Sequence, residues 1–220
     1  MAISPTKLQT FILCPRQYKA KYVTKEVVFA DTPHTLFGTA VHKNIENRLN
    51  NVSALSPILA GLEPILAKHS NKLIGAETPL AINRESLPVD TANKFTMYKK
   101  AWLHCVVDAI YADSSGKRLV ALDWKTGRGK EAKVQADIIK MCLASKYPYF
   151  ERVETVFVHL FDGSVFHDIH RPGVDRFIDI RLEINRLEHA EKTGDFPPKP
   201  NGLCAKWCDV VACPYNGRNK

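Results

Sequence analysis

The chain has 220 residues, 45% of them hydrophobic and 25% charged, which is the composition of a globular protein with a substantial core. No apolar run approaches the ~18 residues that cross a bilayer. The start "MAISPTKLQT" lacks the basic and apolar regions of a secretory signal, so we expect a cytoplasmic protein without a membrane partner. A formal net charge of +8 favours a polyanionic partner.

The order of helical and strand patterns predicts an α/β protein. Three segments have the apolar spacing of helices: 5–22, 37–51 and, with interruptions at two prolines, 53–74. Three segments after them favour strands: 75–83, 94–113 and, after a turn at 113–117, 118–125. The second half continues with a helix, a hairpin joined at a glycine, a long helix and a proline-rich connector: 131–147, 153–171, 174–194 and 195–202.

The cysteines divide into two groups. Cys105 and Cys142 lie in apolar surroundings and are predicted to be small core residues. The other four lie near the two ends of the chain: Cys14, Cys204, Cys208 and Cys213. In a reducing cell such a cluster more often binds metal than forms disulfides, and both iron–sulfur and zinc suit four thiolates.

Charged residues stand at the end of the buried strand in "LVALDWKTGRGK" (119–130). Residues two apart in a strand share a face, so Asp123 and Lys125 point the same way and Trp124 points the opposite way. With Asp113 paired to Lys117 across the turn, Asp108 of the preceding strand falls one residue out of register with Asp123. A bulge or the twist of the sheet would close that gap.

Two carboxylates at one end of a hairpin repel each other unless a cation or a proton lies between them. Oxygen ligands of this kind suit Mg²⁺ or Mn²⁺, and a neighbouring lysine can orient a water or stabilise charge on phosphorus. These groups together indicate metal-dependent phosphodiester hydrolysis. Taken alone, D-x-K is also the pattern of an exposed hairpin end with solvated charges.

Five motifs occur in an order and spacing that resemble the RecB-like branch of the PD-(D/E)XK nuclease superfamily. They are "CPRQYKAKY", "GTAVHKNIE", Asp108, "DWKTG" followed by "VQADII", and "CAKWCDVVACPYNG". The terminal cysteines resemble those of its iron–sulfur members, namely AddB-type nuclease domains, CRISPR-adaptation nucleases and phage-encoded exonucleases.

The resemblance implies a restriction-endonuclease-like fold, in which helices flank a mixed central sheet and a four-cysteine cluster joins the N- and C-terminal segments. It also implies three parts: an N-terminal helix of the cluster domain (1–36), the nuclease core (37–194) and the C-terminal cysteine segment (195–220).

The resemblance also assigns roles to single residues. The metal ligands implied are His42, Asp108, Asp123 and the main-chain carbonyl of Trp124. The other catalytic residues implied are Lys125 and Gln135. The ligands implied for a [4Fe–4S] cluster are Cys14, Cys204, Cys208 and Cys213. Two features depart from the family pattern: Ile139 replaces an aromatic residue after the glutamine, and the cysteine spacing leaves room for zinc. Glu77 stays outside this predicted site.

The function implied is that of a Mg²⁺- or Mn²⁺-dependent deoxyribonuclease, an exonuclease on single-stranded DNA or DNA ends. Its expected setting is the cytoplasm of a bacterium, an archaeon or a phage-infected cell. The expected partners are proteins of recombination, replication or CRISPR adaptation, and an oligomer of the chain is possible. Two alternatives are a catalytically inactive DNA-binding subunit with this fold and a zinc-binding interaction protein. Tyr18 and the basic residues near Cys14 fit either a strand-binding channel or an ordinary helix with a buried face.

Overall fold

A computed structural model describes residues 2–28, 30–69, 72–127, 132–171 and 177–219. The chain forms two compact units. Ala2 and the described residues between Asp31 and Arg171 make the first, and those between Ile3 and Ala30 and from Phe177 onward make the second. None of the described helices is long and apolar enough to cross a membrane.

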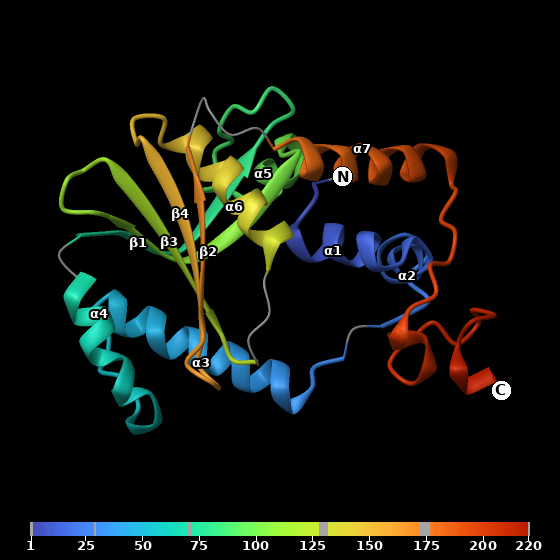
Figure 1. Cartoon of the computed structure of the whole chain (residues 1–220), viewed down its shortest axis with the longest axis horizontal. Coiled ribbons are helices and arrows are strands. Elements are labelled where there is room, and N and C mark those ends of the chain that lie inside the picture. Colours follow the sequence, from blue (N-terminus) through green and yellow to red (C-terminus); the bar gives the residue numbers. More distant parts are fainter. Residues whose placement is uncertain (1, 29, 70–71, 128–131, 172–176, 220) are drawn as a thin grey trace. The chain divides into compact units, whose positions relative to one another are not determined.

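A mixed sheet of five strands forms the centre of the described part of the first unit (Figure 1). The strands lie side by side in chain order: β1 (Leu73–Ile82), β2 (Leu103–Ala112), β3 (Arg118–Lys125), β4 (Arg152–His159) and β5 (Val165–His170). Neighbouring strands are antiparallel except β3 and β4, which are parallel. Helix α6 (Lys133–Lys146) makes the crossover that this parallel pair requires. The α/β fold with a mixed sheet is therefore confirmed.

Helices cover both faces of this sheet. Helix α3 (Pro33–Leu49) packs its buried stripe of Val41, Ile45 and Leu49 against the face that carries Trp124. Pro33 and a capping box between Thr32 and Thr35 fix where it begins. Helix α6 lies against the opposite face, and α3 crosses below the strands in Figure 1. The alternation of side chains along β3 thus decides which residues meet which helix.

The segment predicted as one long strand, 94–113, is a helix followed by a strand. Residues Lys94–Lys100 form α5, and β2 begins only at Leu103. The Asn93 side chain accepts a hydrogen bond from the Thr96 backbone N–H and starts the helix. The prediction of a strand over 94–100 is therefore wrong, because Asn93 caps a helix at this point.

The first predicted helix is also broken. Helix α1 (Pro5–Leu13) stops before α2 (Pro15–Tyr18), and a π-helix (Lys19–Val23) follows. Cys14 between them is extended, with φ −163° and ψ 110°, because a residue before proline avoids the helical region. The predicted interruption of 53–74 is confirmed: a 3₁₀ helix (Pro57–Leu62) and α4 (Glu63–His69) precede β1, and residues 70–71 lie outside the described residues.

The second unit packs the N-terminal helices with the C-terminal part of the chain. Helix α7 (Ile178–Thr193) ends at Gly194, whose φ of +74° places it in the left-handed region; residues 174–176 of the predicted helix lie outside the described residues. Two short 3₁₀ helices, Gly202–Ala205 and Gly217–Asn219, follow. Tyr18 is fully buried, donates its hydroxyl to Glu191 (2.7 Å) and stacks on Phe196, so it is a core residue. The division into 1–36, 37–194 and 195–220 stays a prediction.

Ile45 tests the packing that holds α3 on the sheet. Because its side chain is 1% exposed in the cluster with Trp124, Ile45→Ala is expected to lower the free energy of unfolding by about 2–5 kcal/mol in urea denaturation. Ile58→Ala is the control, because Ile58 is 77% exposed. Equal losses for the two variants would contradict this packing.

Candidate metal and catalytic centre

Two aspartates face each other across the β2–β3 hairpin. The register pairs Ala112 with Leu119 and Ala109 with Leu122, and Asp108 and Asp123 are the residues that adjoin this last pair on the two strands. The expected pairing of Asp108 with Leu122 was therefore wrong, because Leu122 pairs with Ala109, and Asp108 lies close enough for its charge to act on Asp123.

The hairpin turn explains this difference. The Asp113 backbone N–H donates to Arg118 O (2.9 Å), so Asp113 pairs with Arg118 rather than with Lys117. Gly116 has φ +68°, which lets the loop hold one more residue than expected. The Asp113 carboxylate also accepts hydrogen bonds from the backbone N–H groups of Lys117 and Arg118.

Both site aspartates are buried, and their charges interact. Asp108 Oδ2 accepts a hydrogen bond from the Trp124 backbone N–H at 2.7 Å, which fixes the orientation of its carboxylate. Burial and the nearby charge of Asp108 raise the pKa of Asp123 to about 6, against the opposing effects of Lys125 and His42. The two carboxylates would therefore stabilise a positive ion placed between them.

His42 and Glu77 meet Asp108 at the same place. His42 Nδ1 lies 3.2 Å from Asp108 Oδ1 and 3.8 Å from Glu77 Oε1. Hydrogen bonds to Asp108 and Glu77 raise the pKa of His42 to about 10, despite the burial of the ring. One possible ligand atom from each of these three residues lies within 4.8 Å of the other two. Among the described residues, this is the one such group of His, Cys, Asp or Glu side chains that could hold a metal ion. Asp123 does not belong to this group of three, but its charge interacts with those of Asp108 and His42.

Glu77 is the site residue that the sequence prediction missed. The register of β1 and β2 shifts between Leu73 and Gly75, and Glu77 itself has φ +45°. Such an irregularity in a strand redirects a side chain and is frequent beside active sites. Gly75, inside a strand pattern, was the signal that could have revealed it.

Lys125 and Gln135 complete a closed set of polar contacts with Asp123. Lys125 Nζ donates to Gln135 Oε1 (2.7 Å) and lies 2.6 Å from Asp123 Oδ2. Gln135 Nε2 donates to Asp123 Oδ1 at 2.5 Å. Asp123 Oδ2 is buried, and the Lys125 ammonium lies beside it and stabilises its negative charge. Ile139, four residues after Gln135, is fully buried.

This set of donors fits a hard divalent ion. Three carboxylates and one imidazole supply oxygen and nitrogen ligands, the chemistry that Mg²⁺ and Mn²⁺ select. The raised pKa values of Asp123 and His42 both reflect neighbouring negative charge that a cation would offset. The Trp124 carbonyl stays a predicted ligand.

The four terminal cysteines all lie in the second unit and line one pocket. Cys14 Sγ accepts from the Lys199 backbone N–H and Cys204 Sγ from the Asn201 backbone N–H, each at 3.4 Å. Among these described cysteines, no three sulfur atoms lie within 4.8 Å of one another. Cys105 and Cys142 are buried in the first unit, as predicted.

The metal group leads to a test on Glu77. Because the carboxylate shares the group with His42 and Asp108, Glu77→Gln is expected to weaken Mn²⁺ binding about tenfold or more in calorimetric titration. Glu85→Gln, at an exposed position, is the control and should bind as the unchanged protein does. Identical affinities for both variants would remove Glu77 from the site.

This chain is similar to solved structures, among them the following three. The crystal structure of SSO0001 is 19% identical, with a TM-score of 0.52, and the match covers 98% of this chain and 86% of that one. A "Putative exonuclease" from Eubacterium rectale is 10% identical, with a TM-score of 0.48 and coverage of 96% and 88%. The alkaline exonuclease LHK-Exo from Laribacter hongkongensis is 10% identical, with a TM-score of 0.36 and coverage of 88% and 89%. The first shows likeness of fold alone, and the other two scores are too low to support an argument.

A search of curated proteins found no match. The family comparison is decisive, because the model of the PD-(D/E)XK nuclease superfamily matches residues 2–216, nearly the whole chain. Asp123, Trp124 and Lys125 have the order of residues that the last part of the family name spells. The chain therefore belongs to the PD-(D/E)XK nuclease superfamily.

Proposed function

We propose that this protein is a metal-dependent deoxyribonuclease that hydrolyses phosphodiester bonds, as an exonuclease on single-stranded DNA or DNA ends. The observation that carries the proposal is the meeting of Asp108 and Asp123 across a hairpin, with Lys125 Nζ 2.6 Å from Asp123. Membership of a nuclease superfamily supports it, as does the net charge of +8, which favours a polyanionic substrate.

The residues that would hold Mg²⁺ or Mn²⁺ are Asp108, Asp123, His42 and Glu77. A bound divalent ion supplies a water of lowered pKa and neutralises charge on the scissile phosphate. The hydrogen bond from the Trp124 backbone fixes one of these carboxylates in advance, so little reorganisation is needed when substrate binds.

Lys125 and Gln135 act on the reacting groups. The ammonium of Lys125 is held between Asp123 and Gln135, where it can donate to an attacking water or to a phosphate oxygen. Gln135 fixes both neighbours, because its amide donates to Asp123 and its carbonyl accepts from Lys125. Loss of either contact would free the ammonium to move away from the phosphate.

A catalytically inactive DNA-binding subunit is the second candidate function, because the family fold alone could serve it. The complete set of carboxylates, lysine and glutamine favours catalysis over that alternative. Family membership also removes the alternative of a zinc-binding interaction protein with an unrelated α/β body.

We propose further that Cys14, Cys204, Cys208 and Cys213 hold a structural [4Fe–4S] cluster. Their position around one pocket and the backbone N–H groups directed at two sulfurs support this assignment. A single tetrahedral zinc, at about 2.3 Å from each sulfur, is the alternative occupant of the same four thiolates. Such a cluster would close a loop of about 190 residues and so stabilise the second unit.

The wider setting is part of the same proposal. DNA, single-stranded or with duplex ends, is the partner that the charge and the family support. Proteins of recombination, replication or CRISPR adaptation in a bacterial, archaeal or phage-infected cytoplasm would supply unwinding or ends. An oligomer of the chain is compatible with each of these settings.

Cleavage of labelled DNA tests the catalytic proposal. With Mn²⁺, the protein is expected to shorten end-labelled single-stranded DNA and to leave circular single strands intact. Asp123→Ala and Lys125→Ala should each lower the rate roughly 100-fold or more, because each removes a group at the reacting phosphate. Asp90→Ala and Lys100→Ala, at exposed positions, are the controls. Cleavage that persists in Asp123→Ala, or DNA binding without any cleavage, would overturn the proposal.

Metal analysis of anaerobically purified protein tests the cluster. The protein is expected to be brown and to contain about four iron and four sulfide ions per chain. Cys208→Ala should lose the colour and unfold the C-terminal segment, whereas Cys105→Ala, buried in the first unit, should keep the iron content. A colourless protein with one zinc per chain would replace the cluster by a zinc site.

A further inference from the structure

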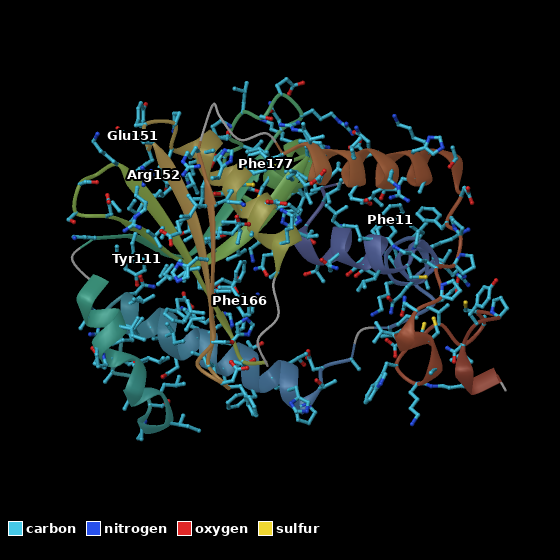
Figure 2. All side chains as sticks on the ribbon, viewed as in Figure 1. Phe11, Tyr111, Glu151, Arg152, Phe166 and Phe177 are labelled. Carbon is cyan, nitrogen blue, oxygen red and sulfur yellow. The ribbon has the colours of Figure 1, made fainter. Side chains whose placement is uncertain are left out.

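A second pocket lies beside the catalytic centre, at the first turn of α6. Its volume is about 250 Å³, and residues of α6, β4 and β5 line it. The apolar lining comes from Ala132, Ala136, Phe157 and Phe166, and the polar lining includes Lys133 and Asp168. Figure 2 labels Phe166, which projects from β5.

One wall of this pocket is shared with the catalytic residues. Phe157 stands beside Asp123 in the parallel register of β3 and β4. The Lys125 ammonium lies 5.5 Å from the centre of the Phe157 ring. On α6, Gln135 lies in sequence between Ala132 and Ala136, which line the pocket. A group held in the pocket would therefore lie next to the phosphate at which Lys125 acts.

An ion pair with a buried lysine fixes the polar part of the lining. Lys140, only 4% exposed, places its ammonium 2.7 Å from Asp168 and 3.1 Å from Asp137. The Asp168 carboxylate is thus held in one position, where it can accept hydrogen bonds from a ligand. Lys133 is mostly exposed and offers a positive charge at the same pocket.

The shape and chemistry of the lining suit a planar heteroaromatic ring. Phe157 is buried, and Phe166 is half-buried and meets the His159 ring edge to face, with the ring centres 5.4 Å apart. Aromatic side chains bind nucleobases by stacking, whatever the base. A volume of about 250 Å³ leaves room for a nucleobase. Because Ile139 is buried and α6 carries no aromatic residue, the aromatic surface here comes from the sheet.

We propose that this pocket binds one unpaired nucleobase of the DNA strand, adjacent to the scissile phosphate. The base packs against the half-buried ring of Phe166, and Asp168 accepts from its exocyclic N–H groups. The inference rests on the proposed function and deepens it, because a base that enters the pocket has left its stack and its partner. The substrate class is then single-stranded or frayed DNA, and an intact duplex is excluded at this position.

Equilibrium binding in EDTA tests the pocket without cleavage. The probes are fluorescent single-stranded oligonucleotides, each with one abasic residue at a successive position from the end. One abasic position should weaken binding to the unchanged protein by about 5- to 150-fold, the value of one base stacked on an aromatic ring. Phe166→Ala should weaken binding of the complete oligonucleotide by a similar factor and should lose its sensitivity to that abasic position. Equal affinity for all oligonucleotides, or a sensitivity that Phe166→Ala retains, would overturn the proposal.

Two further variants separate stacking from folding. Phe166→Leu keeps an apolar side chain in β5 but removes the aromatic face, so its affinity should fall between those of the unchanged protein and Phe166→Ala. Phe95→Ala, at a 68% exposed position of α5, should bind like the unchanged protein. If Phe95→Ala or Phe166→Leu matched Phe166→Ala, stacking on Phe166 would be refuted.

The pocket and the proposed function fail in different ways. Base-dependent binding without cleavage in Mn²⁺ would refute the nuclease activity and keep the pocket. Normal cleavage with equal binding of abasic and complete oligonucleotides would refute the pocket and keep the nuclease. Absence of both binding and cleavage would refute both.

Discussion

The repulsion between Asp108 and Asp123 is the constraint around which this protein is organised. The two carboxylates lie on adjacent strands, both buried and close enough for their charges to interact, and like charges are costly there unless a cation offsets them. The neighbouring groups all act on this charge. The Trp124 backbone N–H holds one carboxylate, the Lys125 ammonium contacts the other, and the His42 ring has a raised pKa because it is surrounded by acidic groups.

The sheet brings these groups together from both of its faces. Alternation along β3 buries Trp124 against α3 and turns Asp123 and Lys125 toward α6, where Gln135 meets them. His42 comes from α3, so the packing of that helix decides the distance between its imidazole and Asp108. The face of the sheet that carries Asp123 and Lys125 also carries Phe157. The Phe157 ring lies beside the Lys125 ammonium and lines the aromatic pocket. The chemistry of the site therefore depends on core packing as much as on its charged residues.

Much of the centre could be predicted from the sequence, because strand alternation and helical spacing are local properties. The strand 118–125 and the shared face of Asp123 and Lys125 follow from period two, and family resemblance pointed to His42 and Gln135. The hairpin register could not be predicted, since it depends on how many residues the loop at Gly116 holds. Glu77 was missed because a local irregularity in β1, and not the strand pattern, directs its side chain to the site.

The central claim is that Asp108, Asp123, His42 and Glu77 bind one divalent ion beside Lys125. Anomalous X-ray diffraction from crystals soaked in Mn²⁺ tests it most directly, because the metal reveals its own position without reference to activity. The account predicts a manganese peak at bonding distance from Asp108 and Asp123, with His42 or Glu77 as a further ligand. A peak confined to carboxylates elsewhere on the protein, or no peak between the two aspartates, would contradict it.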